Sequence, residues 1–175
     1  MEVADLSKVS DQLDNGYAQS KGVSEKMCHE ATQRGLPVPI LRPGNMSPSS
    51  FTGRGCVNLG SVPDRSDWFF DMTPVDYAAR SIVHFSASRP VEALGQTLHI
   101  QNPSLPVKSD DFFAYFTAAI ASKKLATTAF TEWSAVCSKS DKVFDSTLSS
   151  ELLQAAGISY PSVNKELLVT YTAQW

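Results

Sequence analysis

A tyrosine and a lysine lie four residues apart in the stretch NGYAQSKGVSEKM, which covers residues 15–27. A free tyrosine ionises near pH 10, and a neighbouring ammonium group stabilises its phenolate. Such a pair can hand a proton to a carbonyl oxygen while hydride arrives at the carbon. The same spacing also arises by chance on solvated helix surfaces, so spacing alone leaves Tyr17 and Lys21 open between a catalytic pair and two ordinary surface residues.

The residues around this pair predict the helix that must carry it. Asp14 or Asn15 is a good N-cap, and Gly35 is a suitable stop after Arg34. Residues four apart are neighbours on a helix, so the tyrosine and the lysine should share one face. A second set of apolar residues at this interval predicts a buried stripe, formed by Val23, Met27 and Ala31.

Further elements alternate between strand and helix, as in an α/β fold. The apolar run 37–43 predicts a strand buried on both faces, as in a parallel sheet, and 44–55 predicts a loop. Thr73 as the N-cap and Pro74 at the first position predict a helix start. The apolar face of that helix is expected to consist of Val75, Ala79, Ile82 and Val83.

The second half of the sequence continues this pattern. Residues 97–102 predict a strand, and a helix is expected to open at Ser109. Short helices are expected around Trp133, at about 147–156 and at about 162–174. The apolar residues of the helix that opens at Ser109 include Phe112, Phe113, Phe116, Ala119 and Ile120.

Composition excludes several classes of function. Hydrophobic residues make up 42% and charged residues 19% of the chain, as in a globular domain, and the net charge is −3. No Lys/Arg cluster would follow a phosphate backbone, and no apolar run would span a bilayer, so neither nucleic-acid nor membrane binding is expected. The three cysteines are widely spaced and form no metal-ligand pattern with the histidines. We therefore expect a cytoplasmic protein without a metal site.

An ordered set of motifs accompanies the tyrosine and the lysine. NGYAQSKGVSEKMCHEATQRGLPVPILRPG (15–44) is followed by SSFTG (49–53), LGSVPD (59–64) and DMTPVDYAARSIVHFS (71–86). The set resembles the thioester reductase domains of the extended short-chain dehydrogenase/reductase superfamily. Such domains end some nonribosomal peptide synthetases, carboxylic acid reductases and aminoadipate reductases. The resemblance implies that residues 1–175 are the C-terminal portion of a Rossmann-like, NAD(P)-binding domain with a helical substrate-side region.

The same resemblance implies a reaction and a set of site residues. NADPH would supply hydride to a thioester on the phosphopantetheine arm of a carrier protein, and the product would be an aldehyde or an alcohol. Tyr17 would donate the proton, and Lys21 would favour its ionised form and bind the ribose hydroxyls. Pro43 and Gly44 would lie beside the nicotinamide. The substrate channel would include Asn45, Ser49 and Thr52, unless 44–55 is a plain surface connection.

The sequence also departs from the family in ways that leave other functions open. It contains no Gly-rich turn after a strand, because GRGCVNLG (53–60) has Asn58 where a third glycine is needed. The family's catalytic Ser or Thr and a helix of about a dozen residues after Gly53 are missing, and Gly22 replaces a frequent tryptophan. The chain alone is therefore expected to bind NADPH weakly and to be inactive. The alternatives are an inactive module that docks a carrier or partner, or part of another extended reductase or epimerase.

Overall fold

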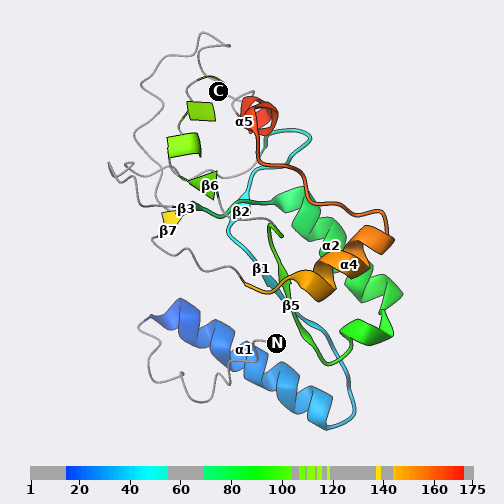
Figure 1. Cartoon of the computed structure of the whole chain (residues 1–175). Coiled ribbons are helices and arrows are strands. Elements are labelled where there is room, and N and C mark those ends of the chain that lie inside the picture. The colour runs from blue at the N-terminus through cyan, green and yellow to red at the C-terminus, as the bar shows by residue number, and fades with distance from the viewer. Residues whose placement is uncertain are drawn as a thin grey trace.

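The computed structural model describes residues 15–54, 69–103, 107, 108, 110–112, 114, 115, 118, 137, 138 and 144–171. This part of the chain contains both helices and strands (Figure 1). In chain order they are α1 (Gly16–Gln33), β1 (Ile40–Pro43), β2 (Met46–Ser47), β3 (Phe69–Phe70), β4 (Thr73–Pro74), α2 (Val75–Ser88), the 3-10 helix η3 (Val91–Ala93), β5 (Thr97–Ile100), β6 (Val107–Lys108), β7 (Cys137–Ser138), α4 (Thr147–Ala155) and α5 (Lys165–Tyr171).

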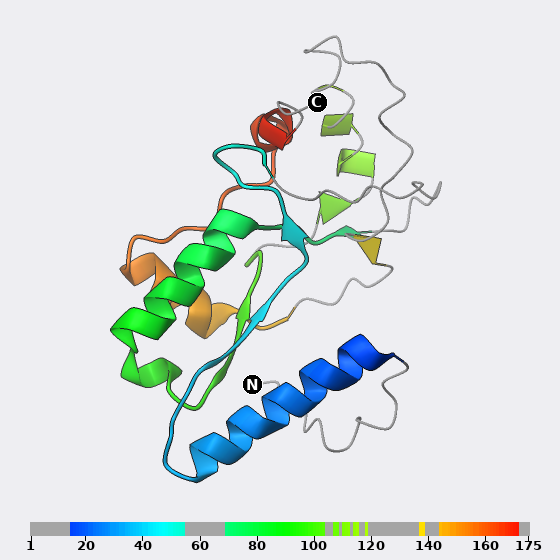
Figure 2. The same ribbon diagram turned by 180° about the vertical axis from the view of Figure 1, so that it is seen from behind.

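The central feature is the parallel pair formed by β1 and β5, in which Ile40 lies opposite Thr97 and Pro43 opposite Ile100. Two parallel neighbours with a helix between them in sequence form a βαβ unit, so the predicted α/β fold is confirmed. In both ribbon views the pair runs between α1 on one side and α2 and α4 on the other (Figures 1 and 2). Two smaller sheets consist of parallel β2–β4 and antiparallel β6–β3–β7.

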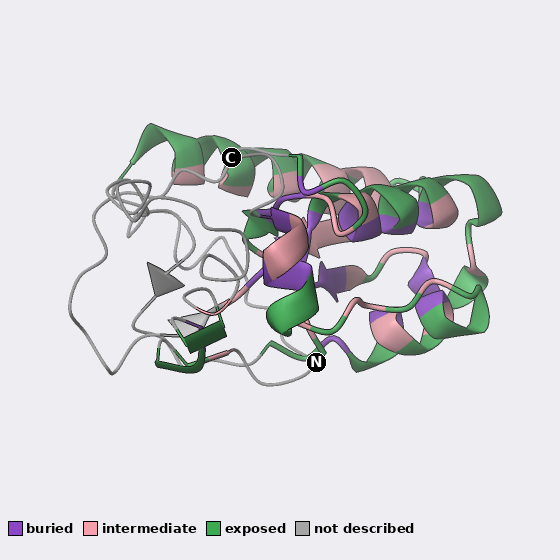
Figure 3. Cartoon of the chain, turned by 90° about the horizontal axis from the view of Figure 1, so that it is seen from above, coloured by how far each residue is buried: buried purple, intermediate pink, exposed green. Residues whose placement is uncertain are grey.

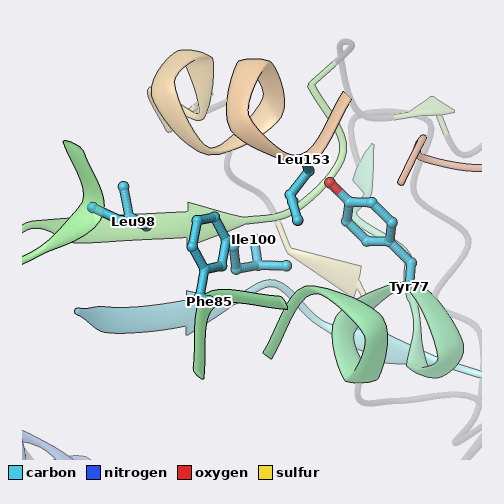
Figure 4. Packing of buried hydrophobic residues seen from close by; sticks show 6 residues of the cluster. Tyr77, Phe85, Leu98, Ile100 and Leu153 are labelled. Atoms are coloured by element: carbon cyan, nitrogen blue, oxygen red, sulfur yellow. The ribbon is translucent and has the colours of Figure 1, made fainter. Parts of the chain in front are cut away.

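The main core lies between α2, β5 and α4 (Figures 3 and 4). Side chains from all three elements converge there and remove a continuous apolar surface from water. The edge-on contact between the rings of Tyr77 and Tyr160, with centroids 5.0 Å apart, extends this packing. The buried members are Tyr77, Phe85, Ala93, Leu98, Ile100 and Leu153.

Helix α1 has the predicted limits but not the predicted buried stripe. The Asn15 side chain accepts a hydrogen bond from the backbone N–H of Ala18 at 2.8 Å, and Gly35 ends the helix with φ of 88°. The expected burial is wrong, because Val23 and Met27 are 61% and 67% exposed. No residue of α1 is buried, since no other described element covers its apolar side.

Helix α2 also forms where predicted, but its buried face is a different one. Thr73 lies in β4, Pro74 takes the N-cap position without a side-chain cap, and the helix begins at Val75. The expected apolar face is wrong, since Val83 is 65% exposed and its three companions are also exposed. The helix instead turns its two aromatic residues toward β5. Its buried residues are Tyr77, Ala78, Ser81 and Phe85.

The other strands, loops and helices predicted from the sequence agree with the structure in part. The strand predicted at 37–43 begins only at Ile40, and its expected burial on both faces is wrong because Pro43 is exposed and the others are partly exposed. The loop predicted at 44–55 includes the short strand β2. Residues 110–112 are helical as predicted, and α4 and α5 fall within the expected ranges. The helix expected around Trp133 lies outside the described residues. No helix in the described part is long and apolar enough to cross a membrane.

Candidate functional site

A groove of about 810 Å³ opens where β1 and β5 end. Ligand sites of α/β sheets characteristically lie at the carboxyl ends of the strands. The walls come from helix α1, the segment that follows β1, the residue that follows β3 and the end of β5. The lining residues are Tyr17, Ala18, Lys21, Gly22, Glu25, Arg42, Pro43, Gly44, Asn45, Met46, Asp71, His99, Gln101 and Phe144.

Tyr17 and Lys21 enter this groove from the first two turns of α1. The Lys21 Nζ atom lies 5.4 Å from the centroid of the Tyr17 ring, within the range of a cation–π contact. Tyr17 is 75% exposed, so its phenol is accessible from solvent. Among the described residues Lys21 forms no ion pair. The structure therefore brings the two predicted residues together, with the ammonium group of Lys21 over the ring of an accessible tyrosine.

The strand end forms the floor of the groove. The Gly44 N–H donates to the carbonyl oxygen of Ile100 at 3.0 Å, which extends the β1–β5 pairing by one residue. A Cβ atom added at Gly44 would lie 2.6 Å from Thr73 Oγ1 and 2.8 Å from Asp71 Oδ2. Glycine at this position therefore lets the strand end pack closely against Thr73 and Asp71.

Asp71 fixes the segment that follows the strand, although no local pattern in the sequence marks it as a site residue. Its carboxylate accepts a hydrogen bond from the Asn45 N–H at 3.2 Å, and the Asn45 carbonyl accepts one from the Thr73 N–H at 2.7 Å. Burial raises the pKa of Asp71, and the bond from Asn45 partly opposes this shift. The predicted residue Asn45 is thereby held in the groove wall.

A second acidic residue in the groove is paired with a strand residue. Arg42 Nε donates to Glu25 Oε2 at 3.0 Å, and Arg42 Nη2 donates to Glu25 Oε1, so the contact is bidentate. Both side chains are partly buried. His29 Nε2 lies 3.7 Å from the same carboxylate. The sequence motifs contain these residues but do not predict their pairing, because Arg42 and Glu25 are 17 residues apart.

Residues of β5 and the segment before α4 close the far side of the groove. The His99 ring stacks on the Phe144 ring with centroids 4.8 Å apart, and Gln101 Nε2 donates to the Phe144 carbonyl at 3.3 Å. Ser149 donates to the His99 carbonyl at 2.6 Å and ties α4 to the same strand. No local signal in the sequence places these residues opposite Tyr17.

The structure does not bring Ser49 and Thr52 into the groove. The Ser49 hydroxyl accepts from the backbone N–H groups of Phe51 and Thr52, at 3.3 and 3.4 Å, and so closes a tight turn. Asp76 holds this turn through the N–H and hydroxyl of Ser50, at 2.6 and 2.7 Å. The predicted contribution of Ser49 and Thr52 to a substrate channel remains a prediction.

A family model described as male sterility protein, an NAD-binding family, matches residues 1–82. Glycine betaine reductase ATRR of Emericella nidulans is 35% identical over 122 residues, which are 62% of this chain and 9% of that protein. A component of the linear gramicidin synthase of Brevibacillus parabrevis is 37% identical over 112 residues, which are 57% of this chain and 2% of that protein.

A solved structure extends the similarity to nearly the whole chain. The terminal R domain of the myxalamid PKS-NRPS biosynthetic pathway matches with a TM-score of 0.65 and 31% identity. The match covers 94% of this chain and 50% of that domain. The chain thus spans half of the solved domain and less than a tenth of either curated relative. The NAD-binding family and the reductase relatives imply a nicotinamide cofactor.

Proposed function

We propose that this chain carries the proton-donor half of an NADPH-dependent reductase. The proposal rests on its sequence and fold, which are those of part of a thioester reductase domain in the extended short-chain dehydrogenase/reductase superfamily. The substrate is an acyl thioester held on a carrier protein, in a cytoplasmic setting. The overall change converts thioester, NADPH and a proton to aldehyde, thiol and NADP⁺. A second reduction would give the alcohol.

One observation carries the proposal: the Tyr17–Lys21 pair and the open strand end share one groove. An ammonium group near a phenol favours the phenolate and makes the phenol a better acid. Tyr17 would donate its proton to the oxygen of the carbonyl group that is being reduced. General acid catalysis of this kind typically contributes about 10²- to 10⁴-fold in rate.

The strand end suits the nicotinamide end of the cofactor, which supplies hydride when bound. A Cβ at Gly44 would overlap side-chain atoms of Thr73 and Asp71, so glycine allows the backbone of this groove-lining segment to pack closely against its neighbours. Lys21 projects into the same groove and is placed to bind ribose hydroxyls. The floor formed by Pro43 and Gly44 would orient the ring, while Tyr17 faces the substrate.

The acyl group would enter along the wall that contains Asn45 and Met46. Met46 is 42% exposed, and its apolar side chain offers a contact for an acyl or pantetheine chain. Asn45 has its backbone fixed by Asp71 and β4, which leaves its side-chain amide free to turn toward a polar ligand group.

A chimeric reductase tests this function. Residues 1–175 would replace the matching half of the myxalamid R domain, which is 31% identical to this chain where the two align. NADPH oxidation would be followed with an acyl-pantetheine thioester, and aldehyde formation would be measured in parallel. We expect turnover, and we expect Tyr17→Phe to reduce it by about 10² or more while NADPH binding persists.

Two results would contradict the proposal. A folded chimera that binds NADPH but gives no aldehyde would favour a docking role for this chain. Full activity of the Tyr17→Phe chimera, with an unchanged pH profile, would show that another group supplies the proton.

Residues 1–175 alone should bind NADPH only weakly in calorimetric titration, because a dinucleotide makes most of its contacts with a Gly-rich turn and an adjacent helix.

A further inference from the structure

Four side chains of α1 follow one another at intervals of four residues: Tyr17, Lys21, Glu25 and His29. Neighbours at this spacing lie about one helical turn apart and can pair on the helix surface. Glu25 is therefore positioned to pair with Lys21 and to withdraw its ammonium group from Tyr17. In the structure the Glu25 carboxylate instead accepts two hydrogen bonds from Arg42, and His29 Nε2 lies 3.7 Å from it.

Three features favour the pairing of Glu25 with Arg42 over its pairing with Lys21. A guanidinium group that donates through two nitrogens matches both carboxylate oxygens, whereas an ammonium group offers a point charge. In addition, a lysine that precedes a glutamate by four residues is in the weaker of the two helical orientations. The side chains of Glu25 and Arg42 are only 12% and 24% exposed, so water screens their pairing weakly.

The pair also joins two elements of the proposed site. Helix α1 buries none of its residues, so apolar packing alone holds it weakly. The two bonds from Arg42 to Glu25 connect α1 directly to β1. Arg42 immediately precedes Pro43, so this contact sets the helix that carries Tyr17 against the strand end.

We infer that Arg42 is a positioning residue that sequesters Glu25 and so leaves Lys21 free to act on Tyr17. This inference deepens the proposed function, since it rests on the role proposed for Lys21. The other charged or titratable groups that line the groove are Asp71 and His99. Asp71 already accepts the Asn45 N–H, and the ring of His99 stacks on Phe144. Glu25 is therefore the acidic group whose release would affect Lys21 most directly.

Carbodiimide cross-linking tests the inference without requiring catalysis. The reagent joins a lysine to a carboxylate only when the two groups are in contact, and peptide mass spectrometry locates the bond. In purified residues 1–175 near neutral pH, we expect little Lys21–Glu25 product. Arg42→Met removes the guanidinium group at similar length, and we expect the product to rise several-fold. The Arg42→Met/Glu25→Gln double variant is the matched control and should give none.

Circular dichroism would establish that each variant is folded. If Arg42→Met fails to fold, Arg42→Lys retains a positive charge without the fork, and we expect a smaller rise in the same product. A folded variant without any rise, or abundant Lys21–Glu25 product in the unchanged chain, would overturn the inference. Because the readout is a bond between two side chains, it can fail while the proposed reduction stands. An inactive chimera would likewise leave the cross-linking result intact.

Discussion

The Lys21 ammonium group lies 5.4 Å from the centre of the Tyr17 ring, one helical turn further along α1. The two side chains share a groove with the end of β1, which is where we propose that the reduction takes place. The arrangement needs no conformational change to put a positive charge beside the phenol. This contact supports a specific expectation for Lys21.

In the chimeric reductase, Lys21→Met should lower turnover by about 10², in the range expected for loss of acid–base assistance. NADPH binding should weaken as well, because the ammonium group is proposed to bind the ribose. Lys26→Met is the control, since Lys26 lines a separate groove on α1 with Met27 and Leu36. Steady-state kinetics would show a defect for Lys21→Met alone, and equal defects in both variants would argue against a specific role.

Gly44→Ala should destabilise the fold. The new methyl group would overlap Thr73 Oγ1 and Asp71 Oδ2, at 2.6 and 2.8 Å. Overpacking of this kind costs about 1–3 kcal/mol. Gly16→Ala is the matched control, because a methyl group there meets nothing within 4 Å. Urea unfolding of both variants would test the steric argument, and equal stabilities would refute it.

Phe85→Ala should strongly destabilise the chain, because Phe85 is fully buried between α2 and β5. Truncation of a buried phenylalanine to alanine typically costs about 3–5 kcal/mol. Val83→Ala, on the exposed face of the same helix, should change stability by no more than about 0.5 kcal/mol. The free energies of unfolding in urea would decide which face of α2 is packed. A larger loss at Val83 would mean that the helix is rotated.

Alkaline pH should destabilise the fold through buried tyrosines. Burial raises the pKa of Tyr171 to about 12, against an ordinary value near 10, despite its 2.9 Å hydrogen bond with Ser47. Burial also raises the pKa of Tyr160. Between pH 10 and pH 12, Tyr171 has lost its phenolic proton in the unfolded chain but keeps it in the folded chain. The contribution of Tyr171 to folding stability is therefore fully present below pH 10 and is lost as the pH rises toward 12.

The expected slope is about 1.4 kcal/mol per pH unit for each such tyrosine. Unfolding in urea over a series of pH values, from slightly alkaline to strongly alkaline, would measure it. Tyr171→Phe should lower stability at neutral pH, because it removes the partner of the Ser47 hydroxyl, but should flatten the alkaline decline. Tyr160→Phe should flatten the decline as well. A decline of the same steepness in both variants would assign the effect to other groups.

Local sequence features were sufficient to predict several structural properties of this protein. Asn15 and Gly35 define the ends of α1, because a capping side chain and a left-handed glycine act over a few residues. The spacing of Tyr17 and Lys21 places them on one helix face for the same local reason. The α/β class and the similarity to thioester reductases also follow from motifs that are continuous along the chain.

The buried face of α2 and the contacts between separate elements depend on tertiary packing. Helix α2 carries apolar residues on two faces, and only the positions of β5 and α4 select the face with Tyr77 and Phe85 over the face with Val83. The sequence alone could not reveal the pairing of Arg42 with Glu25, nor the approach of Asp71 to Gly44, because these contacts join residues from separate elements. Burial depends on which elements meet in space, and periodicity along one helix carries no information about its neighbours.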